Sequence, residues 1–130
     1  MFKSTGIFQY GPGIRAALMV DQQIADFYKS LIPKWISVNP QRYPAHVSVV
    51  RRETPPNMDV WNKYQGTEIE FEYSQIIVAD ETYFWLDVFC PRLGEIREEM
   101  GLKAFPPWRN LYHITLGNSK GEAEDVKNNN

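Results

Sequence analysis

The chain contains two histidines, and each is followed two positions later by a hydroxyl-bearing residue. The two motifs are His46-Val47-Ser48 and His113-Ile114-Thr115. Residues i and i+2 of a β-strand point to the same side, so a motif on a strand presents an imidazole beside a hydroxyl. Two imidazoles on opposite sides of one phosphate can act as general base and general acid, while the hydroxyls bind its oxygens. His46, Ser48, His113 and Thr115 are therefore the predicted catalytic groups of a phosphodiester cleavage that needs no metal.

Both motifs lie in runs of residues that are typical of β-strands. The strands that carry the motifs are predicted at residues 45–50 and 111–116, where the apolar residues next to the motif side chains would pack into a core. Three further strands are predicted at residues 15–20, 67–73 and 83–90, and residues 75–79 extend one of them or form a neighbour. One run alternates strictly between two faces, with Ile69, Phe71 and Tyr73 on one and Glu68, Glu70 and Glu72 on the other.

Two helices are predicted, one in each half of the chain. Asp21 is a suitable N-cap for the first, which ends before Pro33. Pro91 suits the first turn of the second, and Gly101 is suited to end it. Each half then ends on a strand that carries one motif. We expect an α+β fold with two lobes, each a small antiparallel sheet with a helix outside, and a central cleft lined by the two motifs.

Length and composition restrict the function further. A chain of 130 residues, 43% of them hydrophobic, predicts one domain, expected over residues 1–118, with a flexible polar tail over residues 119–130. The net charge of -2 argues against binding to long nucleic acid, whereas a small anionic ligand remains compatible with it. Cys90 is the single cysteine, which excludes an intramolecular disulfide, and no zinc-type spacing is present. Without a signal-peptide run or a membrane-spanning run, the expected location is cytoplasmic, and no cofactor is expected.

The paired motifs, on strands that end two similar halves, resemble those of the 2H phosphoesterase superfamily. That resemblance implies a two-lobed fold and metal-independent cleavage of cyclic phosphates and phosphodiesters. In size, motif spacing and the opening Lys3-Ser4-Thr5-Gly6, the chain is most similar to the viral anti-CBASS enzymes of this superfamily. The resemblance then implies a phage protein that degrades small cyclic di- and trinucleotide signals in the host cytoplasm. Ser48 departs from the common pattern, which has threonine there, but it keeps the hydroxyl donor.

Further residues are candidates for substrate binding. Aromatic rings can stack on nucleobases, and the candidates for this are Tyr10, Trp85, Trp108 and Tyr112. For each of them singly, packing in the core or at its rim is the more common role. Strand alternation places Arg52 on the same face as His46, where it would pair with phosphate, although an arginine at a strand end is often simply exposed.

Two alternative functions remain compatible with the sequence. The first is a 2H phosphoesterase that acts on the 2′,3′-cyclic phosphate ends of RNA. The second is a module that binds cyclic nucleotides without cutting them, although a pure binder needs no matched acid and base. The pattern leaves open which histidine is the acid, whether a ribose 2′-hydroxyl or water attacks, which bases and ring sizes are preferred, and the oligomeric state.

Overall fold

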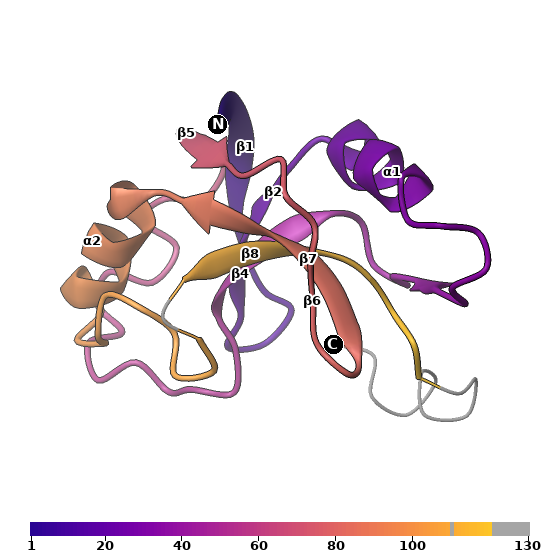
Figure 1. The fold of residues 1–130 in the computed structure, drawn as a ribbon. Coiled ribbons are helices and arrows are strands. Elements are labelled where there is room, and N and C mark those ends of the chain that lie inside the picture. The colour runs from indigo at the N-terminus through magenta and orange to yellow at the C-terminus, as the bar shows by residue number, and fades with distance from the viewer. Residues whose placement is uncertain (110, 121–130) are drawn as a thin grey trace.

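The structure is a computed structural model that describes residues 1–109 and 111–120 (Figure 1). Within these residues, the order of elements is β1 (Phe2–Tyr10), β2 (Ala16–Met19), α1 (Gln22–Ser30), β3 (Asn39–Pro40), β4 (His46–Val50), β5 (Glu68–Tyr73), β6 (Val78–Ala79), β7 (Tyr83–Phe89), α2 (Pro91–Glu99) and β8 (Tyr112–Asn118). The predicted tail falls almost entirely outside the described residues.

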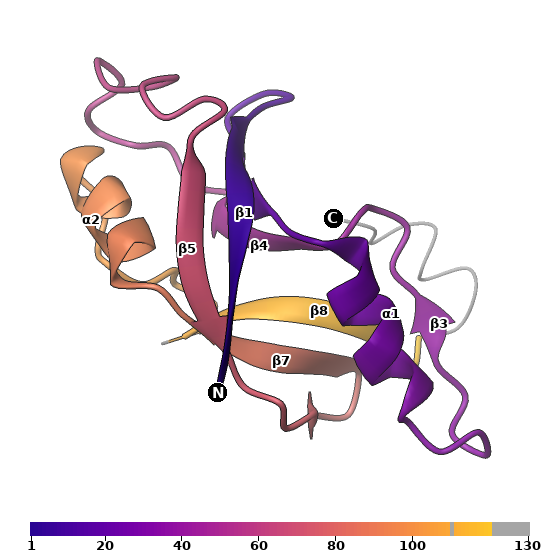
Figure 2. The same ribbon diagram turned by 90° about the horizontal axis from the view of Figure 1, so that it is seen from above.

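Six strands form a closed antiparallel barrel. Around the barrel the order is β1, β2, β4, β8, β7 and β5, and β5 pairs again with β1. The two-residue strands β3 and β6 add to this sheet by pairing with β8 and β7. Seen from above, β1 and β5 run side by side across β7 and β8 (Figure 2). The barrel therefore encloses the space in which the core forms.

The α+β class, the antiparallel pairing and the two helices agree with the sequence-based prediction, but the arrangement of the sheet does not. Two separate sheets facing a cleft were expected, whereas the structure has one continuous sheet. The difference comes from β1, which is not among the predicted elements and which joins β2 of the first half to β5 of the second. The inward face of β1 gives little hydrophobic signal because it includes Gly6, where a Cβ atom would lie only 2.7 Å from Leu18 Cγ.

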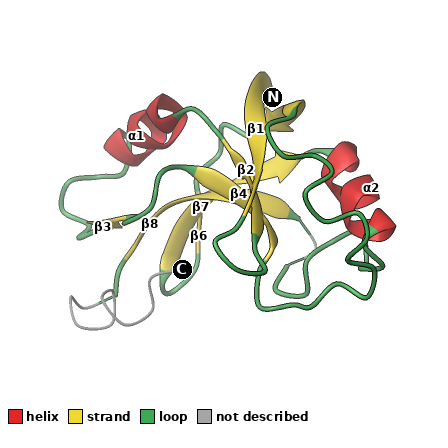
Figure 3. Ribbon diagram, turned by 180° about the vertical axis from the view of Figure 1, so that it is seen from behind, coloured by secondary structure: helices red, strands yellow, loops and turns green. Residues whose placement is uncertain are grey.

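The two halves of the chain repeat the same order of elements. The first half supplies β1, β2, α1 and β4, and the second supplies β5, β7, α2 and β8, apart from the short β3 and β6. The halves are joined along both edges, by β1 with β5 and by β4 with β8. Helix α1 contacts β8 and helix α2 contacts β4, so each helix covers a strand of the other half. Figure 3 shows the two helices at opposite ends of the barrel.

The helix ends follow from the residues that the sequence places there. The Asp21 side chain accepts a hydrogen bond from Gln23 N at 2.9 Å and so caps α1. Pro91 occupies the first turn of α2, where its missing N–H costs nothing. Gly101 lies just after the end of α2 with φ of 83°, a conformation that glycine adopts without strain. In the described part of the chain, neither helix has the length and apolar character needed to cross a membrane.

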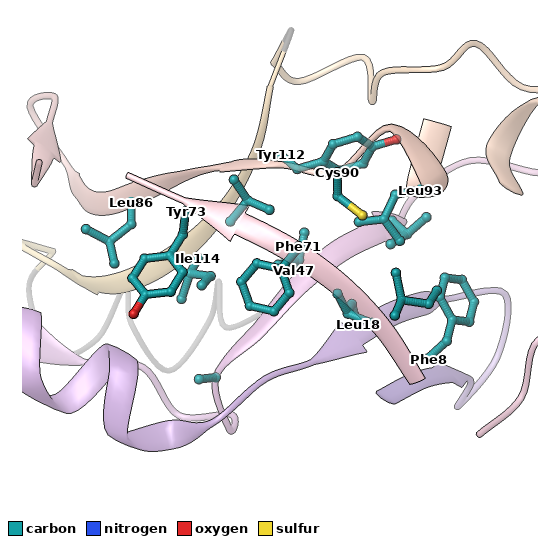
Figure 4. Packing of buried hydrophobic residues seen from close by; sticks show 14 of the residues in the cluster. Phe8, Leu18, Val47, Phe71, Tyr73, Leu86, Cys90, Leu93, Tyr112 and Ile114 are labelled. Atoms are coloured by element: carbon teal, nitrogen blue, oxygen red, sulfur yellow. The ribbon is translucent and has the colours of Figure 1, made fainter. Parts of the chain in front are cut away.

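The barrel interior is filled by apolar side chains from all six strands (Figure 4). Phe71, Val47, Ile114 and Leu86 are almost completely buried there, and Leu93 of α2 packs against the same cluster. Strand alternation therefore turns the residues that flank Val47 and Ile114 away from the core, as predicted. The two motifs present their histidine and hydroxyl side chains on the outer face of the barrel.

The buried, charged side chain of Arg97 connects α2 to the end of β4 and to the neighbouring loops. Arg97 is 1% exposed, and Glu53 binds its guanidinium with two hydrogen bonds of 2.7 and 3.0 Å. The remaining donors reach the carbonyl oxygens of Val49 at the end of β4, Lys103 and Phe105. Every N–H of the guanidinium is thereby used, which is the condition under which a buried arginine is tolerated. Arg97 thus fixes the segment after α2, which leads to Trp108 and β8.

Replacing Arg97 with methionine should destabilise the fold strongly, because Glu53 and three carbonyls would lose their buried partner. We expect a loss of about 3–5 kcal/mol in the free energy of unfolding, measured by urea denaturation. The matched control is Arg92→Met on the same helix, where the side chain is 44% exposed, pairs with the carboxylates of Glu95 and Glu99, and lies over the Tyr64 ring at 5.0 Å. That variant should lose no more than about 1 kcal/mol. Equal losses in the two variants would contradict this account of Arg97.

Candidate active site

The four motif residues meet because β4 and β8 are neighbours. Val47 pairs with Ile114 across the two antiparallel strands. One step in each direction brings His46 beside Thr115 and Ser48 beside His113 on the outer face. Each motif therefore places its imidazole next to the hydroxyl of the other. Two imidazoles at diagonal corners of such a group can contact one small anion from opposite sides.

Two hollows lie over this face and share part of their lining. The first has a volume of about 240 Å³ and contains Ser48, His113 and Thr115, together with Gln41, Arg51, Asp80, Tyr83, Trp85, Trp108 and Arg109. The second has a volume of about 280 Å³ and contains His46 and Ser48, together with Gln9, Gly11, Pro12, Arg15, Ala16, Ala17, Met19, Tyr43, Pro44, Val50 and Arg51. Ser48 and Arg51 line both hollows. The two histidines therefore face different hollows across a shared boundary.

His46 is held in one orientation by the backbone. Its Nδ1 lies 2.8 Å from the carbonyl oxygen of Pro44, which can only accept a hydrogen bond. Nδ1 therefore carries the proton, and Nε2 is left for a substrate. Burial lowers the pKa of His46, while the Pro44 carbonyl acts in the opposite direction by stabilising the protonated ring.

His113 has a different environment. Burial lowers its pKa to about 4, and the charges of Arg109 and His46 act in the same direction, while Asp87 opposes them. Its Nδ1 is buried without a hydrogen-bond partner among the described residues. In the absence of substrate, His113 is therefore neutral near pH 7 and is able to accept a proton.

A cluster of three residues borders His113. Trp85 donates from Nε1 to Asp87 Oδ1 at 3.1 Å, and its ring meets the His113 ring edge-on at 6.4 Å between centroids. The guanidinium carbon of Arg109 lies 4.1 Å from the centroid of the Trp85 ring, and Arg109 Nη2 lies 3.8 Å from Asp87 Oδ1. Asp87 is the direct cross-strand partner of His113. Trp85 and Arg109 line the first hollow together with His113, and Asp87 contacts both Trp85 and Arg109.

Two of the predicted substrate-binding residues, Trp85 and Trp108, line the first hollow. Of the two arginines that follow β4, Arg51 and not Arg52 lines the two hollows, contrary to the prediction from alternation. The reason is an irregularity in the pairing with β2, where Ala17 pairs with Ser48 and Ala16 with Val50. Val49 is the extra residue of this bulge, so Val49 and Val50 both face inward and Arg51 returns to the outer face.

The structure does not bring Tyr10 and Tyr112 to the site. Tyr112 is 2% exposed and points into the core, because it alternates with His113 on β8. Tyr10 packs edge-on against Phe8 and Trp61, at centroid distances of 5.0 and 4.8 Å, and lines neither hollow. Both rings thus have structural roles in place of the predicted stacking on bases.

Sequence reasoning did not identify Gln41, Asp80, Tyr83 and Arg109 as site residues. Gln41 and Arg109 lie in loops, whose paths carry no periodic pattern that could place them. Asp80 caps the turn before β7 by accepting from the backbone N–H groups of Thr82 and Tyr83 at 2.7 and 2.6 Å. Among residues 1–109 and 111–120, no group of three or more His, Cys, Asp and Glu side chains could hold a metal ion.

The lowered pKa of His113 should appear in the pH dependence of stability. The unfolded chain, with an ordinary histidine pKa of 6.5, binds this proton more tightly than the folded protein, whose pKa is about 4. Stability is therefore retained above pH 6.5 and lost as the pH falls towards 4, by about 3 kcal/mol in total. His113→Gln removes this uptake of a proton, so its free energy of unfolding should fall less between pH 7 and pH 4 in urea denaturation. All carboxylates are common to both proteins, and parallel stability curves would contradict the expectation.

Comparisons with known proteins found no match of any kind. No family model matches the chain, no curated protein matches it, and no solved structure matches it. The resemblance to the 2H superfamily therefore stays a prediction that depends on the two motifs. What the protein does has to be inferred from its own residues.

Proposed function

We propose that the protein is a metal-independent phosphodiesterase of the 2H type that cleaves the 3′,5′ bonds of small cyclic oligonucleotides. The observation that carries this proposal is the pairing of β4 with β8, which makes neighbours of two His-x-Ser/Thr motifs that are 67 positions apart. The repeated order of elements in the two halves further supports the resemblance to the 2H superfamily.

The surroundings of the two imidazoles favour different roles for them. His113 is the general base, because burial and the charge of Arg109 keep it neutral. His46 is the general acid, because the Pro44 carbonyl holds Nδ1–H and leaves Nε2 for the leaving oxygen. Burial and the charges of Arg51 and Arg15 lower the pKa of His46 against the effect of the Pro44 carbonyl, so the bound phosphodiester anion is needed to favour the protonated ring. His113 Nε2 takes the proton of the attacking hydroxyl as the new O–P bond forms. His46 Nε2 gives a proton to the leaving oxygen as the old P–O bond breaks, and exchange with water restores both rings.

Ser48, Thr115 and Arg51 supply the donors for the phosphate oxygens. Ser48 and Arg51 border both hollows, where the scissile phosphate would lie, and Thr115 lies beside His46 by register. Hydroxyl and guanidinium donors that are already in place stabilise the extra negative charge of the transition state without reorganisation.

The two hollows favour an internal phosphodiester as the substrate. A phosphate at their shared boundary has a hollow of about 240 Å³ on one side and one of about 280 Å³ on the other. A cyclic dinucleotide carries a nucleoside on both sides of each phosphate, whereas a terminal 2′,3′-cyclic phosphate has nucleotides on one side only. By its resemblance to the viral anti-CBASS enzymes, the protein would be a phage protein that acts in the host cytoplasm and suppresses antiviral signalling.

Replacing either histidine with alanine should lower kcat by about 10²–10⁴, the range expected for a lost general acid or base. Because the two act as a unit, the double variant should be little slower than the slower single variant. Ser48→Ala and Thr115→Val should each lower kcat by about 10²–10³, since the hydroxyls bind developing charge. Binding of the cyclic dinucleotide, measured by calorimetry, should change less than kcat in all of these variants. Full activity in a folded His46→Ala or His113→Ala protein would rule out the mechanism.

The substrate class is tested by offering the purified protein 3′,5′-linked cyclic dinucleotides and, separately, RNA with a 2′,3′-cyclic phosphate end. We expect cleavage of the cyclic dinucleotide, followed by chromatography, and the same rate in excess EDTA, because the proposed groups are imidazoles and hydroxyls. Turnover of the RNA end alone would show that the substrate assignment is wrong. A cyclic dinucleotide that binds and stays intact for hours would identify a binding module, and loss of activity in EDTA that a divalent ion restores would contradict metal independence.

A further inference from the structure

The carboxylate of Asp87 is held next to His113 by contacts that do not involve the histidine. Asp87 on β7 is the register partner of His113 on β8, and both side chains are on the outer face. Directly opposed residues of an antiparallel pair have Cβ atoms about 5 Å apart, which is within reach of an Asp–His hydrogen bond. Trp85 Nε1 fixes Asp87 Oδ1 at 3.1 Å, so the carboxylate is prevented from turning away.

Two atoms in this cluster lack partners that their burial would normally require. His113 Nδ1 and Arg109 Nε are both buried without a hydrogen bond among the described residues. Arg109 also reaches Asp87 Oδ1 only at 3.8 Å, which is an ion pair too long for a hydrogen bond. Buried polar atoms without partners are uncommon in native structures, and such atoms often mark a place where a ligand or a rearrangement completes the network.

We propose that Asp87 is the positioning residue of His113, and that an anionic substrate engages it by drawing Arg109 from Asp87 to a phosphate. This inference rests on the proposed function. Arg109 lines the first hollow and its side chain is 33% exposed, so it can turn towards a phosphate there. Once Arg109 has moved, its ion pair no longer competes for the Asp87 carboxylate, which then accepts a hydrogen bond from His113 Nδ1–H.

The hydrogen bond determines which nitrogen acts as the base. With Nδ1–H donated to Asp87, the lone pair of His113 is on Nε2 and faces the substrate. When Nε2 takes the proton of the attacking hydroxyl, the imidazolium keeps both N–H groups, and the ionised carboxylate beside it stabilises the positive charge. Asp87 is not protonated at any stage. The hydrogen bond between Asp87 and His113 would then form only while a phosphate occupies the site.

The groups whose charges act most on His113 come from three parts of the chain, while Asp80 and Tyr83 line the same hollow. Asp87 lies on β7, His46 and Arg51 lie on and just after β4, and Arg109 lies in the loop before β8. The charges of Arg109, His46 and Arg51 disfavour the imidazolium, and Asp87 is the one group of this set that favours it. A substrate that neutralises the cations therefore leaves the influence of Asp87 unopposed.

The first test follows the His113 ring by NMR titration and needs no activity. Arg109→Gln should raise the pKa of His113, and adding Asp87→Asn to it should lower that pKa by about one pH unit. Asp80→Asn is the matched control, because it removes a carboxylate that lines the same hollow as His113. It keeps the side-chain oxygen that caps the turn before β7. With Arg109 in place, saturating inorganic phosphate should increase the effect of Asp87→Asn on the pKa of His113. An Asp87→Asn effect that matches the control overturns the pairing, and an effect unchanged by phosphate overturns the displacement of Arg109.

The second test is kinetic and uses the cyclic dinucleotide. Asp87→Asn should lower kcat by about 10–10², less than loss of the base itself, with little change in KM, and it should move the acidic limb of the kcat profile to lower pH. Asp87→Glu should restore part of the rate because it restores the charge. A uniform loss with an unchanged pH profile would show that Asp87 has only a structural role. If no cyclic dinucleotide is cleaved while the NMR shifts occur as expected, the proposed function fails and the Asp87–His113 pairing stands.

Discussion

The structure depends on the pairing of β4 with β8, the contact that closes the barrel on one side. This pairing joins the third strand of each half, seals the core over Val47 and Ile114, and brings the two motifs together. A slip of either strand by one residue in this register would turn that strand's histidine inward and expose its apolar side chains. The requirement to bury Val47 and Ile114 therefore also specifies the geometry of the candidate site. Core packing and site assembly are here consequences of the same register.

The loops that form the hollows are held by a second set of contacts. The Arg97–Glu53 pair connects α2 to the end of β4 and to the segment after α2. That segment continues to Trp108 and Arg109, which form part of the wall of the first hollow. A buried, fully hydrogen-bonded arginine restricts the conformations available to these loops in a way that apolar contacts do not. The candidate site thus has strands below it and, beside it, a loop that the hydrogen bonds of Arg97 hold in place.

Much of the structure was accessible from residue patterns because those patterns are local. The alternation in residues 68–73, the Asp21 cap and the Pro91 and Gly101 boundaries depend on neighbouring residues only, and all are confirmed. The strand β1 was missed because Gly6 gives no hydrophobic signal, and its absence from the prediction left the sheet open. Arg51 was missed because a bulge shifts the alternation by one residue, and Arg109 was missed because a loop has no period. The errors at β1 and Arg51 concern long-range pairing, which one strand's sequence does not encode.

Because the chain is synthesised from its N-terminus, the position of β8 determines when the barrel can close. This strand follows all the other described elements along the chain, yet it has partners on both sides and carries the second histidine. A ribosome-bound chain that stops before it has an open sheet, a helix α1 with part of its apolar contact surface missing, and one imidazole. The barrel and the pair of histidines are completed in the same event, when β8 inserts between β4 and β7. The candidate site is therefore incomplete in a nascent chain until β8 has emerged.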